Sequence, residues 1–149
     1  MRAVGLLLLA SAAILLSCVP VRAQQACALL TAAQVSAAAG APMQQAPGPT
    51  SATGCAWGGG SGAARRNVSL SIRPSAEYDT VKARLGSMIV PVSGLGDGAF
   101  FFPTKHNNVV LYLLKGPHVY MLSVSVSTNT QQQNEDAEKT LATQMLLKL

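Results

Sequence analysis

Cysteine is the first residue type here that could carry redox or metal chemistry, and the chain has three, Cys18, Cys27 and Cys55. No second Cys or His accompanies Cys27 or Cys55 at the spacing of a zinc site. In an oxidising compartment Cys27 and Cys55 are expected to form a disulfide, and two reduced structural cysteines are the alternative. Cysteine catalysis would require this disulfide to be broken.

The two histidines, His106 and His118, are the candidates for a metal site or an acid–base pair, with Met121 as a soft ligand for copper. Each lies in a turn-like segment, and a strand pattern over residues 109–115 separates them. If this strand pairs with the next one, the imidazoles lie on the order of 20 Å apart at opposite ends of the hairpin. We therefore expect two solvated histidines, no metal site and no cofactor.

Motifs for nucleophilic catalysis or phosphate binding are equally weak. No serine lies in the Gly-x-Ser-x-Gly turn of many hydrolases, and a histidine partner would have to come from one of the two turns. The segment Gly-Leu-Gly-Asp-Gly over residues 94–98 is followed by an aromatic strand pattern, where a phosphate-binding loop needs a helix. A turn with glycines at positive φ, capped by Asp97, is the better interpretation. The sequence thus predicts no catalytic residue and a non-enzymatic protein.

The compartment is indicated by residues 1–23, which have the anatomy of an export signal. A positively charged start precedes an apolar run over residues 3–16, and small or compact residues precede Gln24. The apolar run is too short for a comfortable membrane span. We expect cleavage between Ala23 and Gln24, which leaves a single domain over residues 24–149 in the periplasm or outside the cell.

Cys18 offers an alternative route to the same compartment. The stretch Leu-Leu-Ser-Cys that ends at Cys18 resembles a bacterial lipobox, whose cysteine becomes a lipidated N-terminus. Leu16 departs from the small residue usual at its position, and a good ordinary cleavage site follows at Ala23, so we favour the soluble exported form. In the alternative form, lipid on Cys18 is the only contact with a membrane, and the protein is a membrane-anchored lipoprotein.

The charge distribution bears on the kind of partner. The chain has 11 Lys and Arg against 6 Asp and Glu, a formal net charge of +5. The positive residues are scattered, and only Arg65 and Arg66 are adjacent. Nucleic-acid binding needs clustered positive charge along the phosphate backbone. We therefore expect no nucleic-acid partner.

Hydrophobic periodicity and turn residues predict the elements that position these side chains. Residues 67–73 and 119–127 alternate as half-buried antiparallel strands do, whereas residues 109–115 are apolar on both faces, as in a central strand. The predicted order is a helix over 30–40, strands near 43–46 and over 54–57 and 67–73, a helix over 74–85, a loop over 90–98, strands over 99–103, 109–115 and 119–127, and a helix over 131–149. The fold class is α+β: a mainly antiparallel sheet of about five to six strands with a short N-terminal helix, a middle helix and a C-terminal helix packed on it.

Several motifs in order look like those of a known family. They are Cys-Ala-Leu-Leu-Thr over residues 27–31 before a short helix, Gly-Cys-Ala-Trp over residues 54–57, and Gly-Leu-Gly-Asp-Gly-Ala over residues 94–99, with a C-terminal helix after them. Together they resemble a family of small exported bacterial domains, many of them lipoproteins, whose function is not established. The resemblance implies the Cys27–Cys55 pair and an α/β/α sandwich similar to that of photosystem subunit P, and it supplies no catalytic residue.

Trp57 and the run Phe100, Phe101 and Phe102 are the remaining candidates for a binding surface. Neighbouring strand residues point to opposite faces, so an outlying ring could line a ligand groove or partner surface, with core packing as the alternative. Our leading hypothesis is a non-enzymatic exported domain that binds a partner protein or an envelope component. The runner-up is a binder of a small apolar or lipid-like ligand, and a hydrolase or metal-dependent enzyme comes third. The sequence indicates neither the partner nor the oligomeric state.

Overall fold

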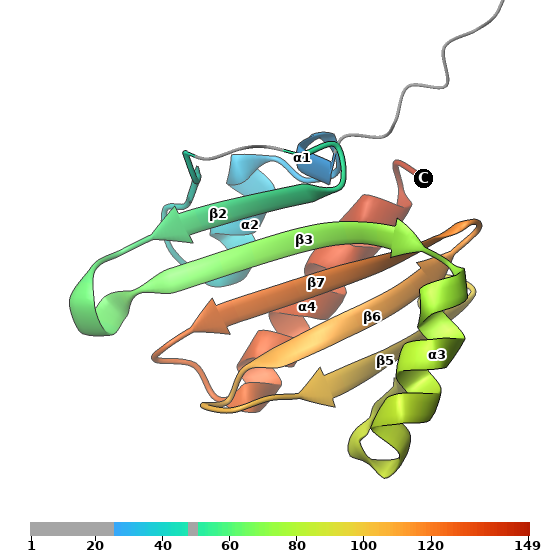
Figure 1. Ribbon diagram of the computed structural model, residues 1–149. Helices are drawn as coiled ribbons and strands as arrows, with labels where there is room; N and C mark the ends of the chain where they lie inside the picture. The colour runs from blue at the N-terminus through green and yellow to red at the C-terminus, as the bar shows by residue number, and fades with distance from the viewer. Residues whose placement is uncertain (1–25, 48–50) are drawn as a thin grey trace, which may run out of the picture.

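Figure 1 shows the protein as a computed structural model, which describes residues 26–47 and 51–149. The predicted export signal over residues 1–23, with Cys18, Ala23 and Gln24 of the predicted processing sites, lies outside the described residues. The described residues form an antiparallel sheet of seven strands in the order β1-β2-β3-β7-β6-β5-β4. The strands are β1 (Gln44–Gln45), β2 (Gly54–Gly59), β3 (Arg66–Pro74), β4 (Val90–Val92), β5 (Gly98–Pro103), β6 (Val109–Lys115) and β7 (His118–Val126). The helices are α1 (Ala26–Leu29), α2 (Ala32–Ala39), α3 (Ala76–Leu85) and α4 (Gln131–Leu146).

The predicted α+β class is confirmed, and the differences lie in short or terminal elements. The segment predicted as a loop over residues 90–98 contains β4, which brings the sheet to seven strands instead of five to six. A one-turn helix, α1, precedes the predicted N-terminal helix. The predicted helix over 131–149 ends at Leu146, because Leu147 and Leu149 are 84% and 39% exposed and another turn would gain little from burial.

Capping side chains explain where the two helices on the α4 side of the sheet begin. The Thr31 hydroxyl oxygen caps α2 by accepting a hydrogen bond from the Gln34 backbone N–H. In turn, the Thr31 backbone N–H donates to Gln34 Oε1. The same reciprocal arrangement between Thr130 and Gln133 begins α4. Helix α2 ends at Gly40, whose φ of 65° suits glycine.

Helices cover the two faces of the sheet unequally, as Figure 1 shows. Helices α1, α2 and α4 lie on one face, over the main core that Val68, Leu70 and Ile72 of β3 enter together as their alternation predicts. Helix α3 lies on the other face, near one end of the strands. Strand β6 is an interior strand with side chains buried on both faces, in agreement with its apolar pattern.

The predicted Cys27–Cys55 disulfide is present, with 5.1 Å between the two Cα atoms, within the usual range for such bonds. It ties α1 to β2, an inner strand of the sheet. Among residues 26–47 and 51–149, no helix is both long and apolar enough to cross a membrane.

Candidate functional site

The predicted aromatic binding surface is largely absent, because its rings face inward. Trp57, Phe100 and Phe101 are each 1% exposed, and only Phe102 is partly exposed. Phe101 enters the main core beneath α4, whereas Phe100 lies on the other face and stacks on Tyr112 with 4.8 Å between ring centroids. The alternation of strand side chains therefore places these rings in two cores rather than on a surface.

The two histidines lie at opposite ends of strand β6. His106 belongs to the turn before β6, with a φ of 61°, and His118 begins β7 opposite Lys115, the last residue of β6. Within the part of the chain that the structure describes, no three His, Cys, Asp or Glu side chains gather as metal ligands would.

The glycine-rich loop over residues 94–98 is a turn held in place by Asp97, in agreement with the sequence. Gly94 and Gly96 have φ values of 78° and 56°. Asp97 accepts hydrogen bonds from the Gly116 backbone N–H (2.8 Å) and from Lys115 Nζ (3.1 Å), and both bonds lower the pKa of its carboxyl, with the Gly116 bond the larger cause. The loop is thereby fixed to the β6–β7 turn, and strand β5 follows it instead of a helix.

Gly96 is the residue of this loop with the tightest surroundings. A Cβ at this position would lie 2.4 Å from the Leu114 carbonyl oxygen and 2.7 Å from Leu113 Cδ1, whereas a Cβ at Gly94 would meet no atom within 4 Å. We expect Gly96→Ala to lower the free energy of unfolding by about 2 kcal/mol and Gly94→Ala, with only a positive φ to oppose it, by about 1 kcal/mol. Urea denaturation of both variants checks this, and equal losses would contradict the steric argument.

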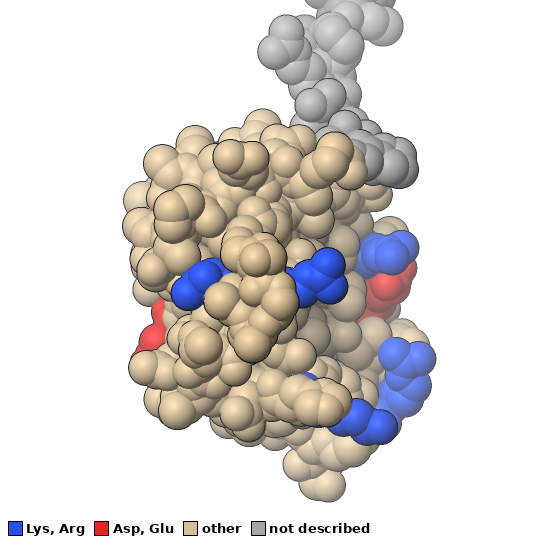
Figure 2. Space-filling view, turned by 90° about the vertical axis from the view of Figure 1, so that its left-hand side faces the viewer, with Lys and Arg blue, Asp and Glu red and all other residues tan. Residues whose placement is uncertain are grey.

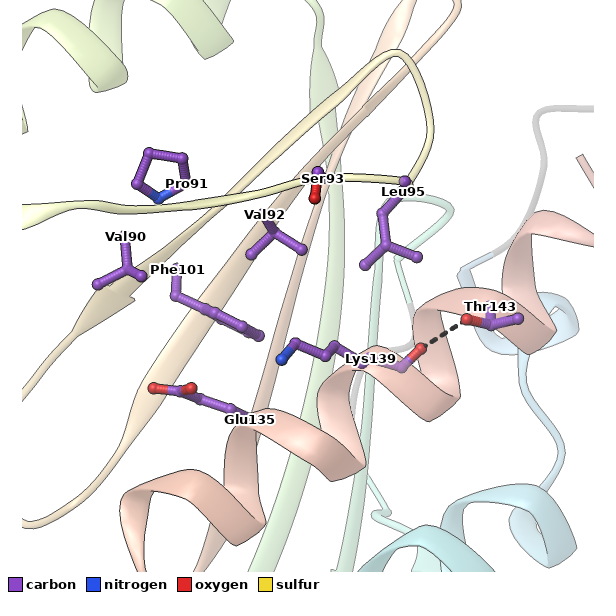
Figure 3. A pocket seen from close by; sticks show the side chains of 10 residues that line it. Val90, Pro91, Val92, Ser93, Leu95, Phe101, Glu135, Lys139 and Thr143 are labelled. Atoms are coloured by element: carbon purple, nitrogen blue, oxygen red, sulfur yellow. Dashed lines mark hydrogen bonds between the residues drawn. The ribbon is translucent and has the colours of Figure 1, made fainter.

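A groove of about 470 Å³ opens between α4 and the β4 edge of the sheet, and we call it the edge groove (Figure 3). One wall is β4 with the loop after it, from Val90 to Leu95. The opposite wall is formed by α4 side chains at successive turns, Glu135, Lys139 and Thr143. The sheet contributes the Phe101 ring between the two walls.

The edge groove combines an apolar base with charged side chains. Lys139 Nζ lies over the Phe101 ring, 5.4 Å from its centroid, in a cation–π contact, and Figure 3 shows the two side chains pointing toward each other. Lys139 also lies 3.9 Å from an Asp136 carboxylate oxygen, and Glu135 lies across the groove from Val90. A ligand in this groove would meet Val92 and Leu95 with its apolar parts and one charge of each sign with its polar parts, while the Phe101 ring lies buried at the base.

Two large apolar side chains are exposed at this part of the chain, Val90 of the groove wall and Met88 two residues before it. Met88 is 56% exposed and Val90 is 48% exposed, and both belong to the few large exposed apolar residues in the described ranges. Strand β4 is an edge strand that pairs only with β5 among the described strands, and Pro91 is its central residue. Proline has no N–H, so this edge is poorly suited to an added β-strand and better suited to side-chain contacts.

Sequence reasoning missed the buried polar residues of α4, Asn134 and Glu138, both 0% exposed. Glu138 Oε1 accepts a hydrogen bond from the Val124 backbone N–H (2.8 Å). Val124 lies in β7 just after Leu122, at which the pairing of β7 with β6 ends. Burial is the main reason that the pKa of Glu138 is raised to about 9. Among the smaller effects, the Val124 N–H lowers this pKa, the Glu135 charge raises it and the Leu111 N–H lowers it. Glu138 is thus a neutral acid at pH 7 that joins α4 to the sheet.

Comparison with known proteins adds no assignment to this geometry. No protein-family model, no curated protein and no solved structure matches the chain. The function therefore has to be argued from the surface that the fold presents.

Proposed function

We propose that this protein is a non-enzymatic domain of the extracytoplasmic space that binds a segment of a partner protein in the edge groove. The observation that carries the proposal is the exposed apolar side chain of Val90 on the groove wall, with exposed Met88 two residues before it in the chain. Exposed apolar surface beside a groove is typical of interaction sites. The disulfide and the export signal expected over residues 1–23 support the compartment.

The shape of the groove favours a peptide segment over a compact ligand. Its α4 wall consists of side chains at successive helical turns, Glu135, Lys139 and Thr143, so the groove is longer than one helical turn. An apolar partner side chain would lie against Val92 and Leu95, and the charges of Glu135 and Lys139 would orient polar groups beside it. Pro91 discourages strand addition at the same edge, which leaves the groove itself as the point of contact.

Site-specific photo-crosslinking in the protein's own host tests this proposal. A photoreactive amino acid at Val90 should give one discrete adduct, and the same group at Thr80, an exposed residue of α3 on the other face, should not. Thr143→Arg, which projects a long side chain into the groove, should remove the Val90 adduct. Thr140→Arg is the matched control, because both threonines are exposed and bond the carbonyl four residues earlier. Equal adducts at Val90 and Thr80, or an adduct unaffected by Thr143→Arg, would reject the proposal.

Binding of a small apolar or lipid-like ligand is the second candidate, and a separate pocket supports it. This pocket of about 280 Å³ lies near the β6–β7 turn, and most of its walls are apolar, with Ile72, Pro117 and Tyr120 among them. Native mass spectrometry of protein purified from its host would detect a bound apolar molecule. Thr53→Trp, which fills the pocket from an exposed position on its wall, should remove that molecule. Protein that carries no ligand would exclude this candidate.

A further inference from the structure

A second concavity lies at the opposite edge of the sheet, beside β1 and the turn that connects β2 to β3. It has a volume of about 650 Å³, and we call it the arginine hollow. Its polar side chains are two arginines and three amides: Arg65, Arg66, Gln44, Gln45 and Asn67. None of the described residues that line it is Asp or Glu, in contrast to the edge groove.

Glycine makes the hollow by leaving a gap in a row of side chains. Gln44 of β1, Gly58 of β2 and Asn67 of β3 are paired across three neighbouring strands. The amides therefore flank a position without a side chain. A Cβ at Gly58 would meet no atom within 4 Å, and Gly58 does not have the positive φ that would require glycine. The backbone conformation therefore does not require glycine at position 58, and the missing side chain leaves open space.

The two arginines give the hollow a positive charge that no described acid neutralises. Within residues 26–47 and 51–149 neither Arg65 nor Arg66 forms a salt bridge. Arg66 Nη1 donates to the Ala64 carbonyl (3.1 Å), and its Nε–H is buried with no hydrogen-bond partner among the described residues. Figure 2 views the molecule from this side and shows positive side chains near the centre of the face, with acidic side chains toward its margins.

We propose that the arginine hollow binds an acidic glycan, a saccharide chain that carries carboxylate groups. Guanidinium groups bind carboxylates through paired hydrogen bonds, which the free donors of Arg65 and Arg66 can supply. The amides of Gln44, Gln45 and Asn67 both donate and accept, as the hydroxyl groups of a sugar do. The gap at Gly58 lets a sugar ring approach the backbone closely.

Nucleic acid fits the same hollow less well. Single strands are held by stacking of bases on aromatic side chains, and none of the lining residues that the structure describes is aromatic. Duplex binding needs a longer series of cations than two adjacent arginines. Positive side chains in Figure 2 are scattered and separated by uncharged surface, so they form no continuous stripe.

Isothermal titration calorimetry with a galacturonic-acid hexasaccharide tests the proposal, with maltohexaose as the neutral probe. We expect binding of the acidic chain only, weakened at least tenfold by Arg65→Gln and by Arg66→Gln. Lys105→Gln removes one exposed charge from the β5–β6 turn and should weaken binding less than twofold. Gly58→Gln fills the gap without a steric clash and should also abolish binding, while circular dichroism shows the native fold.

Each other outcome counts against the acidic-glycan site. Equal affinity for maltohexaose would show that charge plays no part, and equal losses from Lys105→Gln and Arg65→Gln would show unspecific attraction. Unchanged binding in Gly58→Gln would place the glycan elsewhere. No binding of the acidic chain, or tighter binding of a single-stranded oligonucleotide, would overturn the proposal outright.

Discussion

Glu138→Gln is expected to stabilise the protein at pH 8 and to remove most of the pH dependence of its unfolding. The Glu138 carboxyl is fully buried between α4 and the sheet, with one oxygen bonded to the Val124 N–H and Oε2 without a partner in the described structure. Loss of hydration disfavours its charged form and raises its pKa to about 9. Glutamine keeps an oxygen that can accept from Val124 and cannot ionise.

The direction of the pH effect follows from where the proton is bound. An unfolded glutamate has a pKa of about 4.3, so between this value and about 9 the folded state holds a proton that the unfolded state has lost. The contribution of this bound proton to the free energy of unfolding is complete below about pH 4.3. It decreases as the pH rises and is lost once the pH passes about 9. The slope for one such group is at most about 1.4 kcal/mol per pH unit. At pH 8 we expect Glu138→Gln to gain on the order of 2 kcal/mol or more.

Urea denaturation of both proteins from pH 5 to pH 9 measures this difference. Asp136→Asn, on the exposed side of the same helix, is the matched control because it removes a carboxyl that does not enter the core. This control should leave the decline in place, whereas Glu138→Gln should flatten it. A parallel decline in the wild type and Glu138→Gln would show that Glu138 is not the group responsible.

Local sequence patterns predicted the elements whose stabilising residues lie within a few positions of one another. The alternation over 67–73 and the apolar run over 109–115 correspond to β3 and β6, and the Thr31 cap and Gly40 bound α2. The glycines at positive φ in the turn over residues 94–98 were likewise predictable, although the partners of Asp97 lie in the distant β6–β7 turn. In each case a short stretch of sequence contains the physical cause.

Elements that depend on distant neighbours were missed for the same reason. Strand β4 has three residues with a proline in the middle, and its pairing comes entirely from β5. Glu138 lies in the first half of a helix, where an acid is readily explained by the helix dipole, and only the sheet beneath it makes it a buried acid. Its bond partner Val124 belongs to β7, and no local periodicity identifies such a contact.

The candidate sites were hidden because each is assembled from separate segments. The edge groove needs β4 and Phe101 of β5, which are neighbours along the chain, and one face of α4, which begins only at Gln131. Trp57 and the phenylalanine run were conspicuous in the sequence, yet their size is what places three of these four rings in a core. By contrast, Arg65 and Arg66 were visible as an adjacent pair, but Gln44, Gln45 and the gap at Gly58 come from other strands.

Reduction or removal of the Cys27–Cys55 disulfide is expected to cost about 2–4 kcal/mol of unfolding free energy. The bond joins residues 28 positions apart, and closing such a loop removes about 3–4 kcal/mol of unfolded-state entropy in the chain-entropy treatment. Cys27 lies in α1, a helix of four residues, which is too short to be stable alone. Leu29 and Leu30 are buried beside it, so α1 should keep its place in the folded state without the bond.

The double variant Cys27→Ala/Cys55→Ala and the reduced wild type separate the cross-link from packing. Both should unfold at lower urea concentration than the oxidised protein, and both should keep a native spectrum, because the bond acts mainly on the unfolded chain. The double variant should lose slightly more unfolding free energy than the reduced wild type. Alanine leaves space where the buried Cys55 sulfur lay, whereas reduction keeps that atom. Equal unfolding midpoints for oxidised and reduced wild type would mean that the bond contributes no stability. A reduced protein that loses its native spectrum in the absence of urea would instead make the disulfide a condition of folding, with α1 unable to hold its place by burial alone.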